Sequence, residues 1–269
     1  MIRKITSLFL LAATFVACSK NPITGRSQAH LVSESELQAM ATQQYQQFLS
    51  ENRVVSASAD RDAEMVRRVG TRVASAVTNF FNQNGQGNTL AGYHWEFNLV
   101  QNKEANAWCM PGGKVVVYTG LLPITQNEAA LAMVLGHEIS HAVLQHGNER
   151  MSQGLLQQLG GVALAVAVSN QPSETQNLFL NAYGVGSQVG VLLPFSRKQE
   201  LEADRYGMIF GAKAGYNPRE AIALWQRMEK ASDGQAPPEF LSTHPSAGNR
   251  ISQLEKYLPE ALKYYQPIR

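Results

Sequence analysis

The run of residues with the clearest chemical meaning lies in the middle of the chain. His137, Glu138 and His141 form the pattern His-Glu-x-x-His within a stretch that we predict to be helical. Two histidines four residues apart lie on the same helix face, so both imidazoles can reach one zinc ion at about 2.0–2.1 Å. Glu138 lies about 100° further round the helix, where a general base for a metal-activated water must sit. The pattern therefore predicts metal-assisted hydrolysis.

A third protein ligand is needed, because catalytic zinc usually has three protein ligands and one water. His146 is close in sequence, but the extended motif H-E-x-x-H-x-x-G-x-x-H requires a glycine and then a histidine where the chain has Leu144 and Gly147. That interpretation fails. We expect His146 to lie at the C-terminal end of the helix and to complement the helix dipole.

Glu200 and Asp204 are the next candidates. They are four residues apart at the start of a predicted helix and share one face, whereas Glu202 points roughly the opposite way. One carboxylate can bind zinc, and the other can accept an N–H from a ligand histidine. An acidic first helical turn that matches the helix dipole explains the same spacing equally well. Spacing alone leaves the two interpretations open.

The helices that must position these residues are visible in the sequence. Capping boxes at 33–36 and 125–128 predict two helix starts, the second helix being the one that carries His137 and ending at Gly147. Residues 151–196 read as helix and loop, rich in Gly, Ala and Ser, and could form a lid over a cleft. Other helical patterns cover about 59–81, 200–214, 217–230 and 247–257.

A small sheet is expected before the central helix. Trp95, Phe97 and Leu99 alternate with polar neighbours, which predicts a half-buried strand. Residues 105–110 and 114–119 flank a Pro-Gly-Gly turn and predict two more strands. A mostly helical chain with a mixed sheet of three or four strands belongs to the α+β class.

The N-terminus reads as a targeting segment. Arg3 and Lys4 precede an apolar stretch too short to span a bilayer, and a small residue directly before Cys18 resembles the bacterial lipoprotein signal, although Phe15 stands where leucine is usual. A plain signal peptide with an incidental cysteine is the alternative. We expect a signal peptide at 1–17, lipidation of Cys18, an extended tether at 18–32 and a catalytic domain at 33–269.

Composition excludes several other classes. The 269 residues are 44% hydrophobic and 16% charged, as in an ordinary globular protein. Removal of residues 1–17 leaves 21 basic and 21 acidic side chains, so no basic field attracts nucleic acid. With Cys18 lipidated, Cys109 has no disulfide partner and should be a small buried hydrophobe.

The motifs, taken in order, resemble peptidase family M48. The resemblance covers about residues 34–258 and rests on several segments in the expected order. They are Val134–His141, Glu200–Asp204, His244-Pro245 with Arg250 six residues after the histidine, Asn106–Trp108, the turn at 111–113 and Thr119–Leu122. The resemblance implies a zincin-like fold of the gluzincin type with one zinc ion per chain.

The resemblance also implies roles for individual residues. Glu200 becomes the third zinc ligand, and Asp204 supports the ligand shell. His244 is placed near the oxyanion, where Arg250 orients the region, and Glu138 acts as the base. Membrane-embedded members of the family carry several spans, and others carry a C-terminal helical-repeat domain; neither is visible here, and the layout is nearest to soluble lipoprotein members.

The predicted function is therefore a zinc metalloendopeptidase that hydrolyses unfolded or misfolded envelope proteins. The segment Asn106, Ala107 and Trp108, as a free sheet edge, could pair with an extended polypeptide substrate. The expected location is a periplasm-facing lipoprotein anchored through Cys18 in the outer membrane of a Gram-negative bacterium. A non-catalytic lipoprotein that holds client proteins and a structural zinc site are the alternatives, and the intact Glu138 argues against the first.

Overall fold

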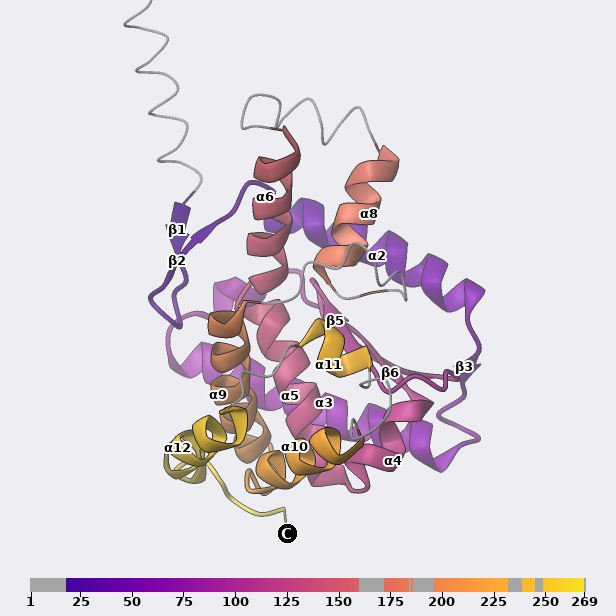
Figure 1. Ribbon diagram of the computed structural model, residues 1–269, viewed down its shortest axis with the longest axis vertical. Coiled ribbons are helices and arrows are strands. Elements are labelled where there is room, and N and C mark those ends of the chain that lie inside the picture. Colours follow the sequence, from indigo (N-terminus) through magenta and orange to yellow (C-terminus); the bar gives the residue numbers. More distant parts are fainter. Residues whose placement is uncertain are drawn as a thin grey trace, which may run out of the picture.

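A four-stranded mixed sheet with helices on both faces forms the centre of the molecule (Figure 1). The computed structural model describes residues 18–159, 172–183, 185, 196–231, 239–244 and 249–268. The sheet order is β3 (Val54–Val55), β4 (Glu96–Val100), β6 (Lys114–Tyr118) and β5 (Ala107–Met110). The pair β4–β6 is parallel and the other two pairs are antiparallel, which leaves β5 at one edge. The α+β prediction is confirmed, and the short β3 was not foreseen.

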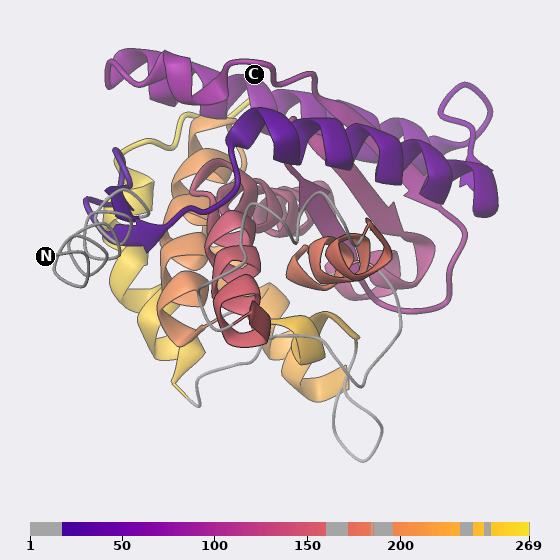
Figure 2. The same ribbon diagram turned by 90° about the horizontal axis from the view of Figure 1, so that it is seen from above.

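The sheet divides the hydrophobic core into two clusters. On one face Phe97, Leu99, Val115 and Val117 share a core with α3 (Arg61–Gln83) and α5 (Glu128–Val143), and α9 (Arg197–Lys213) packs on these two helices. On the other face Trp108 and its neighbours pack against α2 (Glu34–Glu51), α6 (His146–Leu159) and α8 (Pro172–Ala182), which gather on this side of the sheet (Figure 2). Further helices are η1 (Gly87–Leu90), η2 (Thr119–Leu121), α4 (Leu122–Thr125), α10 (Glu220–Ala231), α11 (Glu239–Thr243) and α12 (Arg250–Leu262).

The first predicted helix begins as its capping box requires. The Ser33 hydroxyl accepts a hydrogen bond from the backbone N–H of Glu36, and the Glu36 carboxylate accepts one from the backbone N–H of Ser33. The helix carrying the His-Glu-x-x-His pattern begins elsewhere than predicted. Gln126 adopts a left-handed φ of 62°, and the Asn127 side chain caps α5 by accepting from the backbone N–H of Ala130 at 2.8 Å.

The same helix also ends earlier than predicted. It stops at Leu144, because Gln145 takes a φ of 60° and breaks the helical path before α6 begins at His146. Gly147, the expected stop, therefore lies inside α6. Helix α9 starts three residues before the predicted 200, since Ser196 and Gln199 form a capping box, and it ends before Gly215 with φ 91°.

The expected tether is corrected to a hairpin packed on the domain. Strands β1 (Cys18–Lys20) and β2 (Ser27–Ala29) pair antiparallel beside α6 (Figure 1). The side chain of Asn21 is buried and donates to the carbonyl of Leu144 at 3.0 Å. Buried polar contacts of this kind keep the segment ordered, and the amphipathic pattern of a three-residue strand is too short to be seen in a sequence.

Some predictions concern residues outside those described. The signal peptide at 1–17 lies there, and so does half of the proposed lid at 151–196, namely 160–171, 184 and 186–195. Cys109 is buried, as predicted, and forms no disulfide among the described residues. Among the helices that the structure describes, none combines the length and the apolar character needed to cross a bilayer.

Candidate metal centre

Two helices bring the predicted site residues together because their backbones touch. Gly136 on α5 precedes His137, and Gly207 on α9 follows Asp204 by less than one turn. A Cβ atom on Gly136 would lie 2.6 Å from the carbonyl oxygen of Gly207, so only glycine permits this approach. The contact places the first turn of α9, which carries Glu200, against the turn of α5 that carries His141.

Three donor atoms converge in the space between these helices. Nε2 of His137 lies 3.0 Å from Nε2 of His141. The carboxylate of Glu200 lies 3.6 Å from the first of these atoms and 3.3 Å from the second. Ligands held tetrahedrally at about 2.0–2.1 Å from zinc would be about 3.3–3.4 Å apart. The three side chains therefore have the spacing and the donor types that a zinc ion requires.

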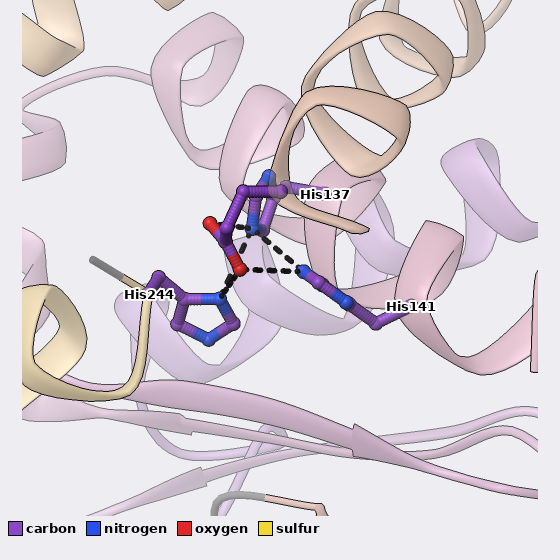
Figure 3. A group of neighbouring side chains, drawn as sticks. His137, His141 and His244 are labelled. Atoms are coloured by element: carbon purple, nitrogen blue, oxygen red, sulfur yellow. Dashed lines mark hydrogen bonds and ion pairs between the residues drawn. The ribbon is translucent and has the colours of Figure 1, made fainter. Parts of the chain in front are cut away.

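His244 belongs to the same cluster and supplies a fourth donor. It follows α11, and Figure 3 shows its ring meeting the two imidazoles of α5 from a separate segment. Its Nδ1 lies 3.2 Å from Nε2 of His137 and 3.0 Å from Oε1 of Glu200. One donor atom from each of the four residues lies within 4.8 Å of the others. The imidazole of His244 therefore lies within the donor cluster itself, whereas the sequence placed it only near the oxyanion.

Asp204 and Arg250 contact the donor residues and hold them in position. Oδ1 of Asp204 lies 3.0 Å from Nδ1 of His137, which leaves Nε2 of that ring facing the cluster. Arg250 donates to Asp204 at 2.6 Å and lies 2.9 Å from Oε2 of Glu200. Its guanidinium also stacks 3.4 Å from the ring centre of Trp225 and donates to the backbone carbonyl of His244 at 3.3 Å. One arginine thus holds two carboxylates in fixed positions and contacts His244 at its backbone carbonyl.

Glu138 is buried beside the cluster and is not one of its donors. Within the described structure its Oε1 accepts no hydrogen bond, and the nearest basic atom, Nε2 of His244, is 3.5 Å away. Burial raises the pKa of Glu138 from an ordinary 4.5 to about 8, and the Glu200 carboxylate adds to the rise while His137 and Arg250 oppose it. A carboxylate that takes up a proton near neutral pH has the property of a general base.

The histidine and glutamate ligands differ in charge. Burial lowers the pKa of His141 well below its ordinary range, so the ring is neutral and offers a lone pair. Burial alone would raise the pKa of Glu200, but His244 and Arg250 outweigh it and keep that pKa well below its ordinary value. Neutral imidazoles and an ionised carboxylate are the forms that bind zinc.

His146 does not have the role that the sequence suggested. It is fully buried at the start of α6, and its Nδ1 lies 3.0 Å from Nδ1 of His141. Its Nε2 lies 2.9 Å from the carboxylate of Glu202. The proposed dipole contact at a helix C-terminus is therefore wrong, because α5 ends before this residue. The sequence indicates only that Glu202 points away from Glu200, and nothing local in it pairs Glu202 with His146.

The predicted substrate segment lies on the edge strand. Ala107 begins β5, and all four side chains of this strand are buried. Trp108 points to the α2 side of the sheet, where it packs edge-on against Phe48 with ring centres 5.0 Å apart. The Nδ2 of Asn106 is buried and has no hydrogen-bond partner in the described part of the chain. The side chain of Trp108 therefore packs in the core, and only main-chain groups of β5 could meet an extended peptide.

Comparison with known proteins agrees with this geometry. The model of peptidase family M48 matches residues 60–258. The metalloendopeptidase OMA1 of Bos taurus, described as mitochondrial, is 32% identical over 265 residues, which are 95% of this chain and 49% of the relative. The beta-barrel assembly-enhancing protease of Escherichia coli is 30% identical over 166 residues, which are 59% of this chain and 33% of the relative. The chain thus spans about half the length, or less, of these relatives.

Proposed function

The chain belongs to peptidase family M48, a family of zinc metalloendopeptidases, and from that premise we propose that it hydrolyses peptide bonds in unfolded or misfolded envelope proteins. The observation that carries the proposal is the arrangement of His137, His141 and Glu200. They present three donor atoms at zinc-ligand spacing, with the buried carboxyl of Glu138 beside them.

The residues around the metal divide the chemistry between them. Zinc, when bound, supplies a Lewis acid that lowers the pKa of water and polarises a carbonyl oxygen. Glu138 removes the proton from the attacking water and passes it to the leaving amine. Without the metal, burial raises the pKa of Glu138 to about 8, and this basicity favours uptake of a proton. The role of Glu138 as base is part of the proposal.

For this chemistry to proceed, a water molecule must be able to take the place of His244 in the donor cluster. A catalytic zinc keeps one position for water beside three protein ligands, but four protein donors meet here. His137 and His141 are fixed within α5 and Glu200 within α9, whereas His244 lies beyond the end of the five-residue α11. We therefore assign to His244 the ability to leave the cluster and to donate a hydrogen bond to the developing oxyanion, as expected for it.

An extended substrate is supported by the position of β5. One edge of β5 pairs with β6, and its other edge pairs with no strand in the described part of the chain. Immediately before the strand, the carbonyl of Ala105 accepts from the backbone N–H of Phe240 at 3.1 Å, and the carbonyl of Asn106 accepts from that of Tyr118 at 3.0 Å, so pairing by a peptide would begin at Ala107. Main-chain pairing selects for extended conformation more than for side chains, which favours unfolded polypeptides as substrates.

Location in a bacterial envelope is the finer part of the proposal. It is supported by the lipoprotein-like signal before Cys18 and by a relative whose name concerns the assembly of β-barrels. The mitochondrial OMA1 relatives show that the family also serves another compartment. Labelling of cells with radioactive palmitate should mark the parent protein and not a Cys18→Ser variant. Equal labelling of both would contradict the lipid anchor.

The peptidase proposal is tested with the purified protein and two substrates. Casein, which is largely unfolded, should be cleaved, and a folded protein closed by disulfides should be spared until it is reduced. Cleavage should stop with a chelator and return with zinc. Cleavage that survives complete removal of the metal would contradict the proposal, as would equal cleavage of the folded and the reduced substrate.

A further inference from the structure

We propose that His146, Glu202 and Arg26 form a positioning relay that holds the metal ligand His141 from behind and connects it to the N-terminal hairpin. The inference rests on the proposed metal site, in which His141 is a ligand. None of the three relay residues contributes a donor to the metal cluster. They come from three separate parts of the chain, namely α6, α9 and the loop between β1 and β2.

A metal bound to Nε2 of His141 would fix the direction of each hydrogen bond in the relay. Nε2 of His141 faces the other ligands, so its lone pair is directed at the metal and the ring proton is on Nδ1. That N–H donates to Nδ1 of His146, 3.0 Å away. The proton of His146 is then on Nε2, where it donates to Oε2 of Glu202 at 2.9 Å. Each donor meets an acceptor, and with both rings neutral no other assignment satisfies both contacts.

The carboxylate at the end of the relay is itself fixed by Arg26. Nε of Arg26 donates to both oxygens of Glu202, at 2.8 and 3.1 Å. Its two terminal nitrogens donate to the two oxygens of Glu149 at 2.6 and 2.7 Å. The three side chains are only 9–15% exposed. A guanidinium fork with both sides engaged leaves Glu202 little freedom to turn away from His146.

His137, the other ligand histidine of α5, is held by a similar set of contacts that contains one residue fewer. His137 contacts Asp204 directly, and Asp204 is held by Arg250. His141 reaches its carboxylate, Glu202, through the additional imidazole of His146, and that carboxylate is held by Arg26. Both ligands are thus backed by a carboxylate and an arginine. Carboxylates behind ligand histidines fix ring orientation and raise ligand basicity.

Through the relay, the N-terminal hairpin helps to position the metal ligand His141. Arg26 stands directly before β2, and the same hairpin begins at Cys18. The hairpin also packs beside α6, on which His146 and Glu149 lie (Figure 1). Loss of the hairpin contact would therefore loosen His141 without any change at the donor atoms themselves.

The experiment compares Glu202→Gln with Glu149→Gln. Glu149 is a partner of the same arginine and is at least as buried, with 9% of its side chain exposed against 15% for Glu202, but the His146 ring donates to Glu202. Zinc affinity is measured by competition with a chromophoric chelator, and thermal unfolding of the zinc-free proteins is followed in parallel. Because the amide is a weaker acceptor than the carboxylate, Glu202→Gln should weaken zinc binding about 10- to 100-fold. Glu149→Gln should lower the melting temperature at least as much but weaken zinc binding less than about 3-fold.

A second variant tests the middle of the relay and guards against a folding defect. His146→Leu fills the same buried volume and leaves the N–H of His141 without an acceptor, so zinc affinity should fall by at least as much as in Glu202→Gln. The visible spectrum of the cobalt-loaded variant should also shift, because the ring orientation of a ligand changes.

Equal losses of zinc affinity in Glu202→Gln and Glu149→Gln would overturn the relay and leave a merely structural ion-pair network. Unchanged affinity and an unchanged cobalt spectrum in Glu202→Gln and His146→Leu would overturn it as well. Failure of the parent protein to bind zinc would remove both the relay and the proposed function. Zinc binding with the predicted ranking of variants, but without casein cleavage, would support the relay and count against the function.

Discussion

Gly136 on α5 and Gly207 on α9 meet backbone to backbone at the metal centre. A Cβ atom on Gly207 would lie 2.8 Å from the backbone nitrogen of His137, and one on Gly136 would lie 2.6 Å from the carbonyl oxygen of Gly207. Neither neighbour is a flexible side chain that can move aside. The separation of the two helices, and with it the distance from His141 to Glu200, is set at this contact.

Gly207→Ala should therefore push the helices apart. Alanine improves helix propensity by about 1 kcal/mol, but the backbone clash outweighs the gain, and we expect a net loss of about 1–3 kcal/mol together with weaker zinc binding. Chemical denaturation and zinc competition measure the two effects.

Gly211→Ala is the matched control on the same helix. Its Cβ would clash with the end of the Met133 side chain, which can take another rotamer, and would lie at an ordinary 3.7 Å from the backbone carbonyl oxygen of Ala132. We expect near-parental stability and zinc affinity. Tight zinc binding by Gly207→Ala would show that the helix separation does not control the site.

His244→Ala should separate metal binding from turnover. His137, His141 and Glu200 remain as ligands, so the variant should still bind one zinc ion per chain. Cleavage of casein should fall about 10²- to 10³-fold, the usual cost of losing one oxyanion donor. His94→Ala, at an exposed histidine outside the cluster, is the control and should cleave normally. Loss of stoichiometric zinc in His244→Ala would instead make this residue a required ligand.

Glu138→Gln should stabilise the zinc-free protein in a pH-dependent way. The folded-state pKa of about 8 lies above the ordinary 4.5, so the contribution of this carboxyl to stability is full below 4.5 and is lost as the pH rises toward 8. Glutamine does not titrate. The stability advantage of the variant should therefore grow between pH 5 and pH 8, by at most about 1.4 kcal/mol per pH unit. A difference that stays constant over this range would contradict the burial of an ionisable Glu138.

The sequence was sufficient where the determinants are local. The spacing of His137 and His141 on one helix, the capping box at Ser33 and the alternation around Phe97 each depend on residues within one turn or one strand. Their predicted elements are present in the structure. The resemblance to family M48 added the long-range pairing of this helix with Glu200, which spacing alone had left open.

The remaining features depend on contacts that no local pattern encodes. Thr125 has the cap sequence, but its hydroxyl donates to the carbonyl of Leu122, and Asn127 takes the capping role after a left-handed turn. His146 lies 56 residues from Glu202, and Arg26 lies 176 residues from it. A relay of buried side chains from three parts of the chain becomes visible only when the packing is known.

The central claim is that Glu138 is the base of a zinc peptidase. The measurement that tests it most directly is the rate of casein cleavage by Glu138→Gln beside the parent, with zinc content determined on the same samples. We predict one zinc ion per chain in both proteins and a rate lower by about 10²- to 10⁴-fold in the variant. Cleavage by zinc-loaded Glu138→Gln at the parental rate would contradict the mechanism.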